Sequence, residues 1–499
     1  MEFSEDQAGA WAALGAHLSR HGVDLDAKAT GPRRDRDAPA ETVAVLGKAG
    51  SGKTALLARL AAALREAGLD SVSADYEPRR RRARRTFAVL APTNKAASVL
   101  RGRGVPATTV HRVLYVPVYD PQFEKIAKWL TEPDAPKPET EALDDAALER
   151  ARLAFAGHGS VPAALAAAGL SGSDFISGWT RREEALDVGL VDEASMLDDR
   201  LMEDLRAIFD LLILFGDPAQ LAPVGQSGAM VFEALPEARR MSLSRIHRQA
   251  EDNPILDLAH ALQAPGLDFH DFEAMVEAAA ARDPRVALPG RVDSDLMAES
   301  PVLCWRNATR IRLIHGFRGA HGAPEDALAP GEPLICDGLE LPLKHRKKRI
   351  DLETRGLVKG AQVIYRGAGR KPGFARLHVV GAEQPDIAAA AIIKIEGPER
   401  EEPLIASAAR MGAAFVHGAA CTIHKGQGSQ WPAVQVFAPD LLAAARSGRE
   451  EAGVPLWRRL AYVAVTRAQE RLLWVTRWRM SRPERPLGAA LQETGSSQP

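Results

Sequence analysis

The sequence predicts an α/β fold with parallel β-sheets, because apolar runs of strand length recur and end in glycine or small polar residues. These runs lie at residues 42–46, 86–91, 185–191 and 211–215. Each has the length of a strand, and a continuous apolar run suits a strand that is buried on both faces. The 499 residues are enough for two to four domains, each with a sizeable core.

The first of these strands runs into a glycine-rich loop and then a helical segment. Residues 47–54 read GKAGSGKT and fit the P-loop pattern GxxxxGK[ST]. Glycines let successive N–H groups face one point, and the helix N-terminus adds partial positive charge there. A glycine-rich turn that binds nothing is the alternative, and the strand-loop-helix context disfavours it. We therefore expect a bound nucleoside triphosphate.

Each residue of this loop has an expected part in holding the nucleotide. Lys53 is expected on β- and γ-phosphate oxygens, and the Thr54 hydroxyl on Mg²⁺. The expected nucleotide-binding residues of the loop are Gly47, Lys48, Ala49, Gly50, Ser51, Gly52, Lys53 and Thr54.

Charge and cysteine content exclude several classes of protein. The formal net charge of −1 gives no global attraction to polyanions, so nucleic-acid binding must come from local patches. Cys304, Cys336 and Cys421 show no CxxC spacing, which argues against a disulfide framework, a zinc site or an iron–sulfur cluster. No apolar run of about twenty residues and no signal-peptide pattern is present. We expect a cytoplasmic protein without a membrane partner.

The N-terminal segment predicts a helix that begins after Ser4. Ser4 can serve as the N-cap, and Gln7 three residues later completes a capping box. A glutamine shortly before a P-loop can instead present its amide to the edge of adenine. The local sequence favours the capping role.

Two polar clusters follow strands after the P-loop. Pro92, Thr93 and Asn94 follow the strand at 86–91, where ligands of open α/β sheets bind. A second cluster contains Thr109 and His111. Just before that strand, residues 79–85 carry six arginines; a solvated loop is the default interpretation, and contact with a phosphate backbone is the alternative.

Residues 115–184 interrupt the strand pattern with proline-rich turns and alanine-rich helical stretches at 146–156 and 161–168. We interpret this segment as an insertion between strands of the sheet. Its function is not legible from its residues.

The later strands deliver charged and amide groups suited to phosphate chemistry. Asp192 can ligate Mg²⁺ through its water shell, and Glu193 can polarise the water that attacks the γ-phosphorus. Gln220 follows the strand at 211–215 and is expected on the γ-phosphate side, while Arg248 supplies a cation that can reach the same phosphate.

Taken together, these segments resemble the motifs of superfamily 1 DNA helicases. Two further stretches, residues 421–431 and 461–470, resemble the fifth and sixth motifs of that family and are most similar to its RecD/Dda-like branch. The motifs, in the order of the family, are GKAGSGKT at 47–54, APTNKAA at 91–97, VDEASM at 191–196, GDPAQLAPVG at 216–225, IHRQ at 246–249, CTIHKGQGSQW at 421–431 and AYVAVTRAQE at 461–470.

The resemblance implies two RecA-like domains with ATP in the cleft between them. Residues 1–240 would form domain 1A, with insertion 1B at about 115–184. Residues 241–499 would form domain 2A, with a small SH3-like β-barrel, 2B, inserted at about 325–410. Residues 360–365 and 377–380 are candidate strands of that barrel.

The resemblance also implies an ATP-dependent motor that moves 5′ to 3′ on single-stranded DNA and acts at duplex junctions as a monomer. Gln7 then resembles the adenine-reading glutamine of the family, and Arg248 and Arg467 would act as arginine fingers. The implied catalytic residues are Lys53, Asp192, Glu193, Gln220, Arg248 and Arg467. The implied DNA contacts are Pro92, Thr93, Asn94, Thr109, His111, Thr422, His424, Lys425 and Ser429.

Some interpretations stay open. Trp431 or Tyr115 could stack on a base, although a core position is favoured for each, and the basic run at 344–349 is by default a solvated loop. The insertion at 115–184 is longer and more helical than the strand-separating pin of relatives, and Gly426 stands where relatives often have a serine. An ATP-switched binding or loading protein that does not unwind, and an RNA helicase of the same superfamily, are the alternative functions.

Overall fold

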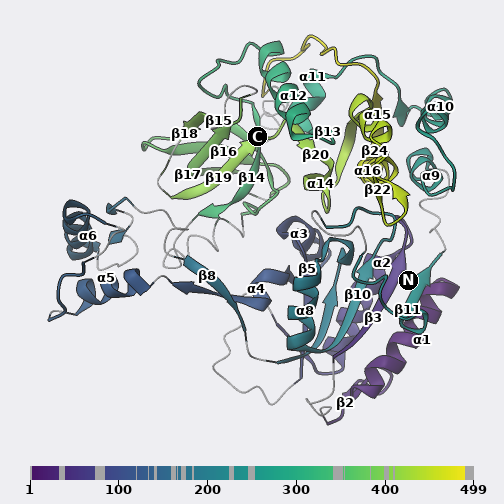
Figure 1. Cartoon of the computed structure of the whole chain (residues 1–499), viewed down its shortest axis with the longest axis horizontal. Helices are drawn as coiled ribbons and strands as arrows, with labels where there is room; N and C mark the ends of the chain where they lie inside the picture. Colours follow the sequence, from purple (N-terminus) through teal and green to yellow (C-terminus); the bar gives the residue numbers. More distant parts are fainter. Residues whose placement is uncertain are drawn as a thin grey trace, which may run out of the picture.

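The computed structural model describes most of the chain, and Figure 1 shows its arrangement. The described residues are 3–32, 40–72, 85–119, 121–132, 134–139, 143–158, 164–165, 167–169, 176–182, 185–223, 230–244, 253–340, 352, 355–382, 384–397, 404–407, 409 and 411–488. Among them, no helix is both long enough and apolar enough to cross a bilayer.

The first half of the chain forms a seven-stranded parallel sheet. Its order is β11-β3-β10-β9-β5-β4, with β6 paired to β5. The strands are β3 Glu41–Gly47, β4 Asp70–Ser71, β5 Thr86–Ala91, β6 Ala107–Thr109, β9 Leu186–Val191, β10 Phe209–Gly216 and β11 Arg240–Leu243. The four strands expected from apolar runs are therefore confirmed.

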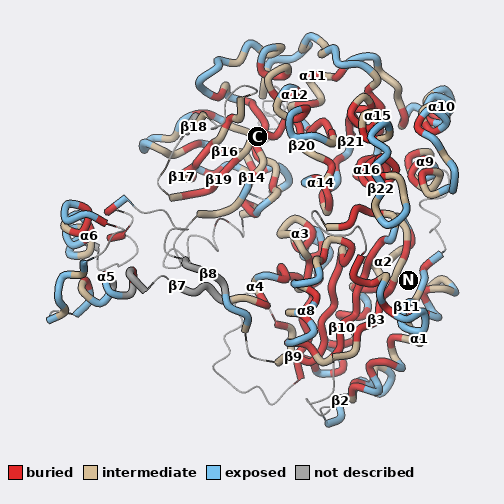
Figure 2. The backbone as a smooth tube through the Cα atoms, viewed as in Figure 1, coloured by how far each residue is buried: buried red, intermediate tan, exposed pale blue. Residues whose placement is uncertain are grey.

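Helices cover both faces of this sheet, which explains why its strands are apolar throughout. Val43 and Val45 of β3 pack towards α1, α2 and α3, whereas Ala44 packs with the residues of α4 and α8. The helices are α1 Glu5–Arg20, α2 Lys53–Glu66, α3 Asn94–Gly102, α4 Val110–Leu114 and α8 Asp199–Ile208. Figure 2 shows the strands between them as buried.

The insertion begins as an antiparallel pair of strands, β7 Tyr115–Tyr119 and β8 Ile176–Arg181. Two helices, α5 Pro121–Thr131 and α6 Asp145–His158, follow at its far end (Figure 1). They share a small core of their own, which includes Ile126 and Leu148. The helix expected at 146–156 is confirmed, and the stretch at 161–168 lies partly outside the described residues.

The second half forms a five-stranded parallel sheet in the order β12-β24-β21-β13-β20. Its strands are β12 Val286–Ala287, β13 Val302–Cys304, β20 Ala420–Thr422, β21 Trp431–Phe437 and β24 Ala468–Val475. One core joins the sheet to α9, α10, α15 and α16, and a second joins it to α11 and α12. These helices and the short α14 are α9 Pro254–Ala261, α10 Phe269–Ala280, α11 Ser294–Glu299, α12 Asn307–Ala320, α14 Ile423–Gly426, α15 Ala438–Arg446 and α16 Leu456–Val465.

A third sheet is inserted between α12 and β20 of the second half. Its order is β16-β15-β14-β19-β17-β18, and β16 also pairs with β17, so five of its strands close into a ring. The strands are β14 Pro333–Glu340, β15 Gln362–Ala368, β16 Phe374–Val379, β17 Asp386–Ile395, β18 Leu404–Ser407 and β19 Gly412–His417. Leu377, Ile393 and Phe415 lie in its core.

Two expected boundaries need correction. The division at residue 240 falls inside the first sheet, because β11 pairs with β3 as far as Leu243. The ring also extends beyond residue 410, because β19 pairs with both β14 and β17 as far as His417. Both errors come from strands that pair with partners distant in sequence.

The remaining short elements are β1 Val23–Asp24, β2 Ala29–Thr30, β22 Glu450–Glu451, β23 Val454–Pro455, η1 Ala194–Met196 and η2 Glu237–Arg239.

Candidate nucleotide site and nucleic-acid cleft

The P-loop joins the end of β3 to the start of α2. Gly50 and Gly52 have φ of +83° and +81°, a conformation that favours glycine. The Lys53 ammonium group donates to the Lys48 carbonyl at 2.9 Å and to the Gly47 carbonyl. A Cβ at Gly47 would collide with Ser51 Oγ and lie 3.1 Å from Leu243 Cβ, so the neighbours also require glycine there.

Asp192 directly follows β9 and lies beside this loop. Its N–H group donates to the Leu90 carbonyl at 2.9 Å, and its carboxylate accepts from the Glu193 N–H group at 3.0 Å. Burial and the neighbouring Glu193 carboxylate raise the pKa of Asp192 to about 7, against the opposing effect of Lys53. The carboxylate is therefore in a position that a cation would stabilise.

Asp192 and Thr54 supply oxygen ligands of the kind that Mg²⁺ prefers. Asp192 supplies a buried carboxylate, and Thr54 lies in the first turn of α2, next to Lys53. Within the part of the chain that the structure describes, no three acidic, histidine or cysteine side chains gather into a metal cluster. Mg²⁺ commonly binds through one or two protein oxygens and completes its shell with phosphate oxygens and water.

Glu193 has an unusual backbone conformation. Its φ is +53° and its ψ is +41°, the left-handed region, at the start of the 3-10 turn η1. This conformation costs a non-glycine residue about 1–2 kcal/mol, and such strain clusters at functional sites. The strain is an independent reason to treat Glu193 as a functional residue.

Gln220 is held from two directions. The Ser195 hydroxyl donates to its amide oxygen at 3.1 Å, and its backbone carbonyl accepts from the Arg459 guanidinium at 2.7 Å. Ser195 belongs to the first half of the chain and Arg459 to α16 in the second half. The loop that carries Gln220 therefore lies at the contact between the two halves.

A second residue of α16 reaches the P-loop itself. The Tyr462 hydroxyl accepts from the Ala49 N–H group at 3.0 Å and donates to the Asp217 carboxylate at 2.6 Å. The Gln427 amide adds a bond to the Leu221 carbonyl at 3.3 Å. Sequence reasoning missed Arg459, Tyr462 and Gln427 as site residues; only their places in or beside the fifth and sixth motif segments could have suggested them.

The two expected arginine fingers have different outcomes. Arg467 is buried, and its guanidinium donates to the Ser429 carbonyl, the Val463 carbonyl and the Thr466 hydroxyl, each at 3.1 Å. These partners belong to the second half of the chain. Arg248 lies outside the described residues.

Gln7 makes the contact of a helix cap. Its amide oxygen accepts from the Ser4 N–H group at 3.2 Å, and the residue is buried at the start of α1. The helix start expected at Ser4 is confirmed. The capping contact uses the acceptor that an adenine-reading glutamine would offer to the exocyclic amine.

A cleft of about 630 Å³ runs between the two halves and the ring of strands. Eight of the nine residues expected to contact DNA line it, and Thr422 does not. The eight are Pro92, Thr93, Asn94, Thr109, His111, His424, Lys425 and Ser429. A cavity of about 240 Å³ shares Asn94, Asp337 and Lys359 with this cleft and so adjoins it.

The cleft also contains three cationic residues that sequence reasoning did not assign as DNA contacts: Lys95, Arg310 and Lys359. Burial lowers the pKa of Lys95, and it also lowers the pKa of His111 and His424, so that both imidazoles are neutral at pH 7. The lining therefore combines few full charges with many neutral hydrogen-bonding groups.

The two aromatic candidates differ from each other. Trp431 lines the cleft but is only 5% exposed and belongs to the core of the second half. The Tyr115 hydroxyl donates to Asp204, and burial together with this bond raises its pKa to about 12. The core position favoured for Trp431 is confirmed.

Arg85 departs from both interpretations of the arginine run. It is 5% exposed, and its guanidinium donates to the Asp187 carboxylate at 3.0 Å and to the His21 carbonyl. It is therefore a buried structural residue, neither a solvated side chain nor a phosphate contact. Residues 79–84 and the basic run at 344–349 lie outside the described residues.

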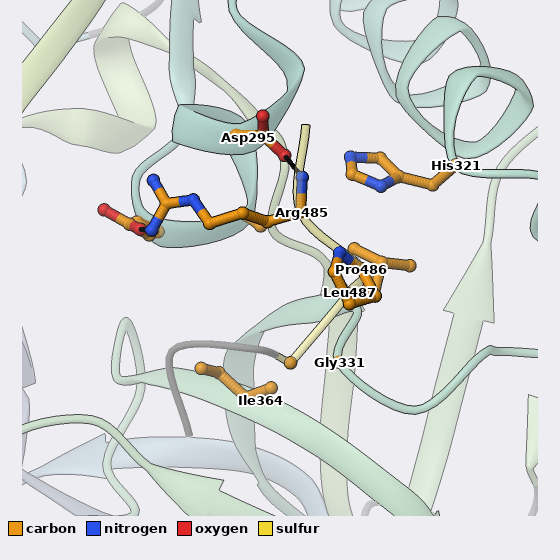
Figure 3. A pocket seen from close by; sticks show the side chains of 10 residues that line it. Asp295, His321, Gly331, Ile364, Arg485, Pro486 and Leu487 are labelled. Atoms are coloured by element: carbon orange, nitrogen blue, oxygen red, sulfur yellow. Dashed lines mark hydrogen bonds and ion pairs between the residues drawn. The ribbon is translucent and has the colours of Figure 1, made fainter. Parts of the chain in front are cut away.

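A separate small cavity lies under the C-terminal segment (Figure 3). Its volume is about 40 Å³, and its lining includes Asp295, His321, Gly331 and Arg485. The Glu484 and Arg485 N–H groups donate to the Asp295 carboxylate, which holds the segment against α11. A cavity of this size suits little more than a water molecule.

These features define a P-loop protein whose nucleotide loop lies where two parallel-sheet halves meet. The family model of an AAA domain matches residues 37–284, and that of a UvrD-like helicase C-terminal domain matches residues 417–475. Both matches agree with the order of the motifs and support a superfamily 1 helicase of the RecD-like type.

A curated relative and two solved structures are similar to the chain. The ATP-dependent RecD2 DNA helicase of Deinococcus radiodurans is 28% identical over 298 residues, which are 57% of this chain and 36% of that protein. The chain thus spans about a third of that relative. The Bacteroides Pif1 helicase with ADP-AlF3 and single-stranded DNA has 14% identity and a TM-score of 0.45, covering 100% of this chain and 98% of the other. The Candida albicans Pif1 helicase has 14% identity and a TM-score of 0.46, covering 99% and 100%.

Proposed function

We propose that the protein is an ATP-dependent DNA helicase that moves 5′ to 3′ on single-stranded DNA and acts as a monomer at duplex junctions. One observation carries the proposal. The P-loop and a cleft lined by eight expected DNA contacts both lie between the same two halves of the chain. A nucleotide that changes the contact between the halves would therefore also change the cleft.

The three sheets fit the domain plan of such a motor. The first sheet would be domain 1A, and the segment from β7 to β8 would be insertion 1B. The second sheet would be domain 2A, and the closed ring of strands would be the SH3-like barrel 2B.

The chemistry of hydrolysis would be divided between the halves. Lys53 and the P-loop amides bind the triphosphate, and Glu193 orients and deprotonates the attacking water. Thr54 and Asp192 would hold Mg²⁺, which neutralises charge on the phosphate oxygens.

Four further residues would act on the γ-phosphate and the base. Gln220, held by Ser195, would contact the γ-phosphate. Arg248 and Arg467 would stabilise developing charge from the second half, and Arg467 would exchange its carbonyl partners for phosphate oxygens as the halves close. Gln7 would read adenine through its amide.

The DNA strand would lie in the cleft. Neutral groups such as Thr93, Asn94 and His111 suit contacts with the sugar-phosphate backbone, which carry little sequence information. Positive charge in the cleft would come mainly from Lys425, because Arg310 is paired with Glu396 and Lys359 with Asp337. Thr422, which precedes α14, would act through its backbone position.

The test of this proposal is steady-state ATP turnover with and without an oligothymidylate. Single-stranded DNA should raise turnover several-fold, because strand binding favours the contact between the halves. Lys53→Ala should remove turnover under both conditions and so exclude a contaminating ATPase. A rate indifferent to DNA would contradict a motor, and equal stimulation by oligouridylate would favour an RNA substrate.

A further inference from the structure

The Tyr462 hydroxyl joins three segments that are far apart in sequence. It accepts from the Ala49 N–H group of the P-loop and donates to Asp217, at 3.0 and 2.6 Å. The side chain is 1% exposed and lies on α16 of the second half. One oxygen atom thus connects the nucleotide loop, the loop after β10 and a helix of the other half.

The direction of these bonds is fixed. Burial and the adjacent Asp217 carboxylate raise the pKa of Tyr462 well above its ordinary range, so the hydroxyl keeps its proton. That single proton is donated to Asp217, and an oxygen lone pair accepts from Ala49. The other carboxylate oxygen of Asp217 accepts from the Ala219 N–H group at 3.0 Å.

The same helix carries the connection towards Arg467. The Thr466 hydroxyl donates to the Tyr462 carbonyl at 2.8 Å, and the Arg467 guanidinium donates to the Thr466 hydroxyl at 3.1 Å. One turn before Tyr462, Arg459 donates to the carbonyl of Gln220. A displacement of the P-loop or of Asp217 would therefore be transmitted to both ends of α16.

We propose that Tyr462 is a positioning residue for ATP hydrolysis, whose hydroxyl ties α16 to the P-loop and Asp217 so that the position of Arg467 follows the state of the nucleotide loop. The inference rests on the proposed function, because it assigns the coupling within that motor. Tyr462 does not touch the reacting atoms; it acts through Arg467 and Gln220. Its removal should therefore lower turnover more than nucleotide affinity.

The decisive variant is Tyr462→Phe, which removes one oxygen and keeps the ring in the core. With saturating oligothymidylate, kcat for ATP should fall about tenfold, which is the worth of one good hydrogen bond to a charged group. The Kd for the fluorescent probe mant-ADP should stay within about twofold, because Lys53 and the other P-loop amides are intact. Tyr365→Phe in β15 is the matched control, with no change expected in kcat.

A second variant distinguishes coupling from simple support of the fold. Asp217→Asn keeps the shape of the side chain and an acceptor oxygen but removes the charge. Its effect on kcat and that of Tyr462→Phe should be less than additive, because both act on one bond. Additive effects on kcat would overturn the inference.

The remaining outcomes distinguish failure of the Tyr462 inference from failure of the proposed function. A Tyr462→Phe protein with unchanged DNA-stimulated kcat would overturn the inference and leave the proposed function standing. If Tyr462→Phe lowered kcat and mant-ADP affinity by the same factor and also lowered the melting temperature, the residue would have a structural role only. That result would also overturn the inference. A wild-type protein whose turnover ignores DNA would overturn the proposed function itself.

Discussion

The Ser195 hydroxyl donates a hydrogen bond of 3.1 Å to the amide oxygen of Gln220. Ser195 follows β9 and Gln220 follows β10, so the bond links two neighbouring strand ends on the nucleotide side of the sheet. Both residues are buried. Because the oxygen is engaged, the amide nitrogen of Gln220 remains the group to offer to a phosphate oxygen.

Ser195→Ala should therefore disturb turnover beyond its effect on stability. Loss of the bond should lower DNA-stimulated kcat roughly fivefold to tenfold and reduce the free energy of unfolding by about 1 kcal/mol. Ser294→Ala is the matched control, because the buried Ser294 bonds Ser481 in the second half. Ser294→Ala should reduce the free energy of unfolding by a similar amount without lowering kcat. Wild-type turnover in Ser195→Ala would show that Gln220 needs no such restraint.

Glu193→Gln should separate binding from chemistry. The amide keeps the size of the side chain but cannot accept the proton of the attacking water, so turnover should fall by about 10²–10⁴-fold. Binding of mant-ADP and of oligothymidylate should be nearly unchanged. Glu203→Gln, on the exposed side of α8, should match the wild type. Normal turnover in Glu193→Gln would remove the general-base assignment.

Gly47→Ala should prevent nucleotide binding. The added Cβ would collide with Ser51 Oγ and press on Leu243, so the loop cannot keep its shape. The Kd for mant-ADP should rise by at least about tenfold. Gly9→Ala provides the comparison, since its Cβ would meet nothing within 4 Å. Because Gly9 lies within α1, Gly9→Ala should raise the free energy of unfolding by about 0.5–1 kcal/mol. Tight nucleotide binding by Gly47→Ala would contradict the packing argument.

The stability of the fold should depend on Glu41 at acid pH. Burial raises the pKa of Glu41, but hydrogen bonds from His21, His17 and Arg20 outweigh it and lower the pKa to about 2. Because the folded pKa lies below the unfolded value, the contribution is complete above about pH 4.5 and is lost as the pH falls towards 2.

Urea unfolding of the wild type and of Glu41→Gln should reveal this contribution. The difference in their free energies of unfolding should shrink by on the order of 2 kcal/mol between pH 6 and pH 3. Glu277→Gln, at an exposed position of α10, should show no such trend. A constant difference between wild type and Glu41→Gln would mean that the hydrogen bonds do not stabilise the charged form.

The parts of the fold that could be predicted from the sequence are those with a local cause. Val43, Ala44 and Val45 are all apolar because both faces of β3 are covered, so the strand is legible without its neighbours. The shape of the P-loop follows from its own glycines. The helix start after Ser4 likewise follows from residues within one turn.

What could not be predicted depends on partners distant in the chain. From the sequence, Arg85 looks like part of a solvated basic run. In the structure it is bonded to Asp187, which lies 102 residues away in the chain. The β16–β17 pairing that closes the ring leaves no local mark. Tyr462 meets Ala49 across 413 residues, and nothing in either segment specifies that contact. The P-loop could therefore be predicted, whereas its bond to the second half could not.

Duplex unwinding with tailed substrates tests most directly whether nucleotide turnover at the P-loop drives movement along DNA. The wild-type protein, ATP and Mg²⁺ should separate a duplex that carries a 5′ single-stranded tail, and should leave a duplex with only a 3′ tail largely intact. Glu193→Gln should separate neither. Unwinding of the 3′-tailed duplex alone would contradict the polarity, and separation of neither duplex despite DNA-stimulated ATP turnover would contradict the helicase assignment.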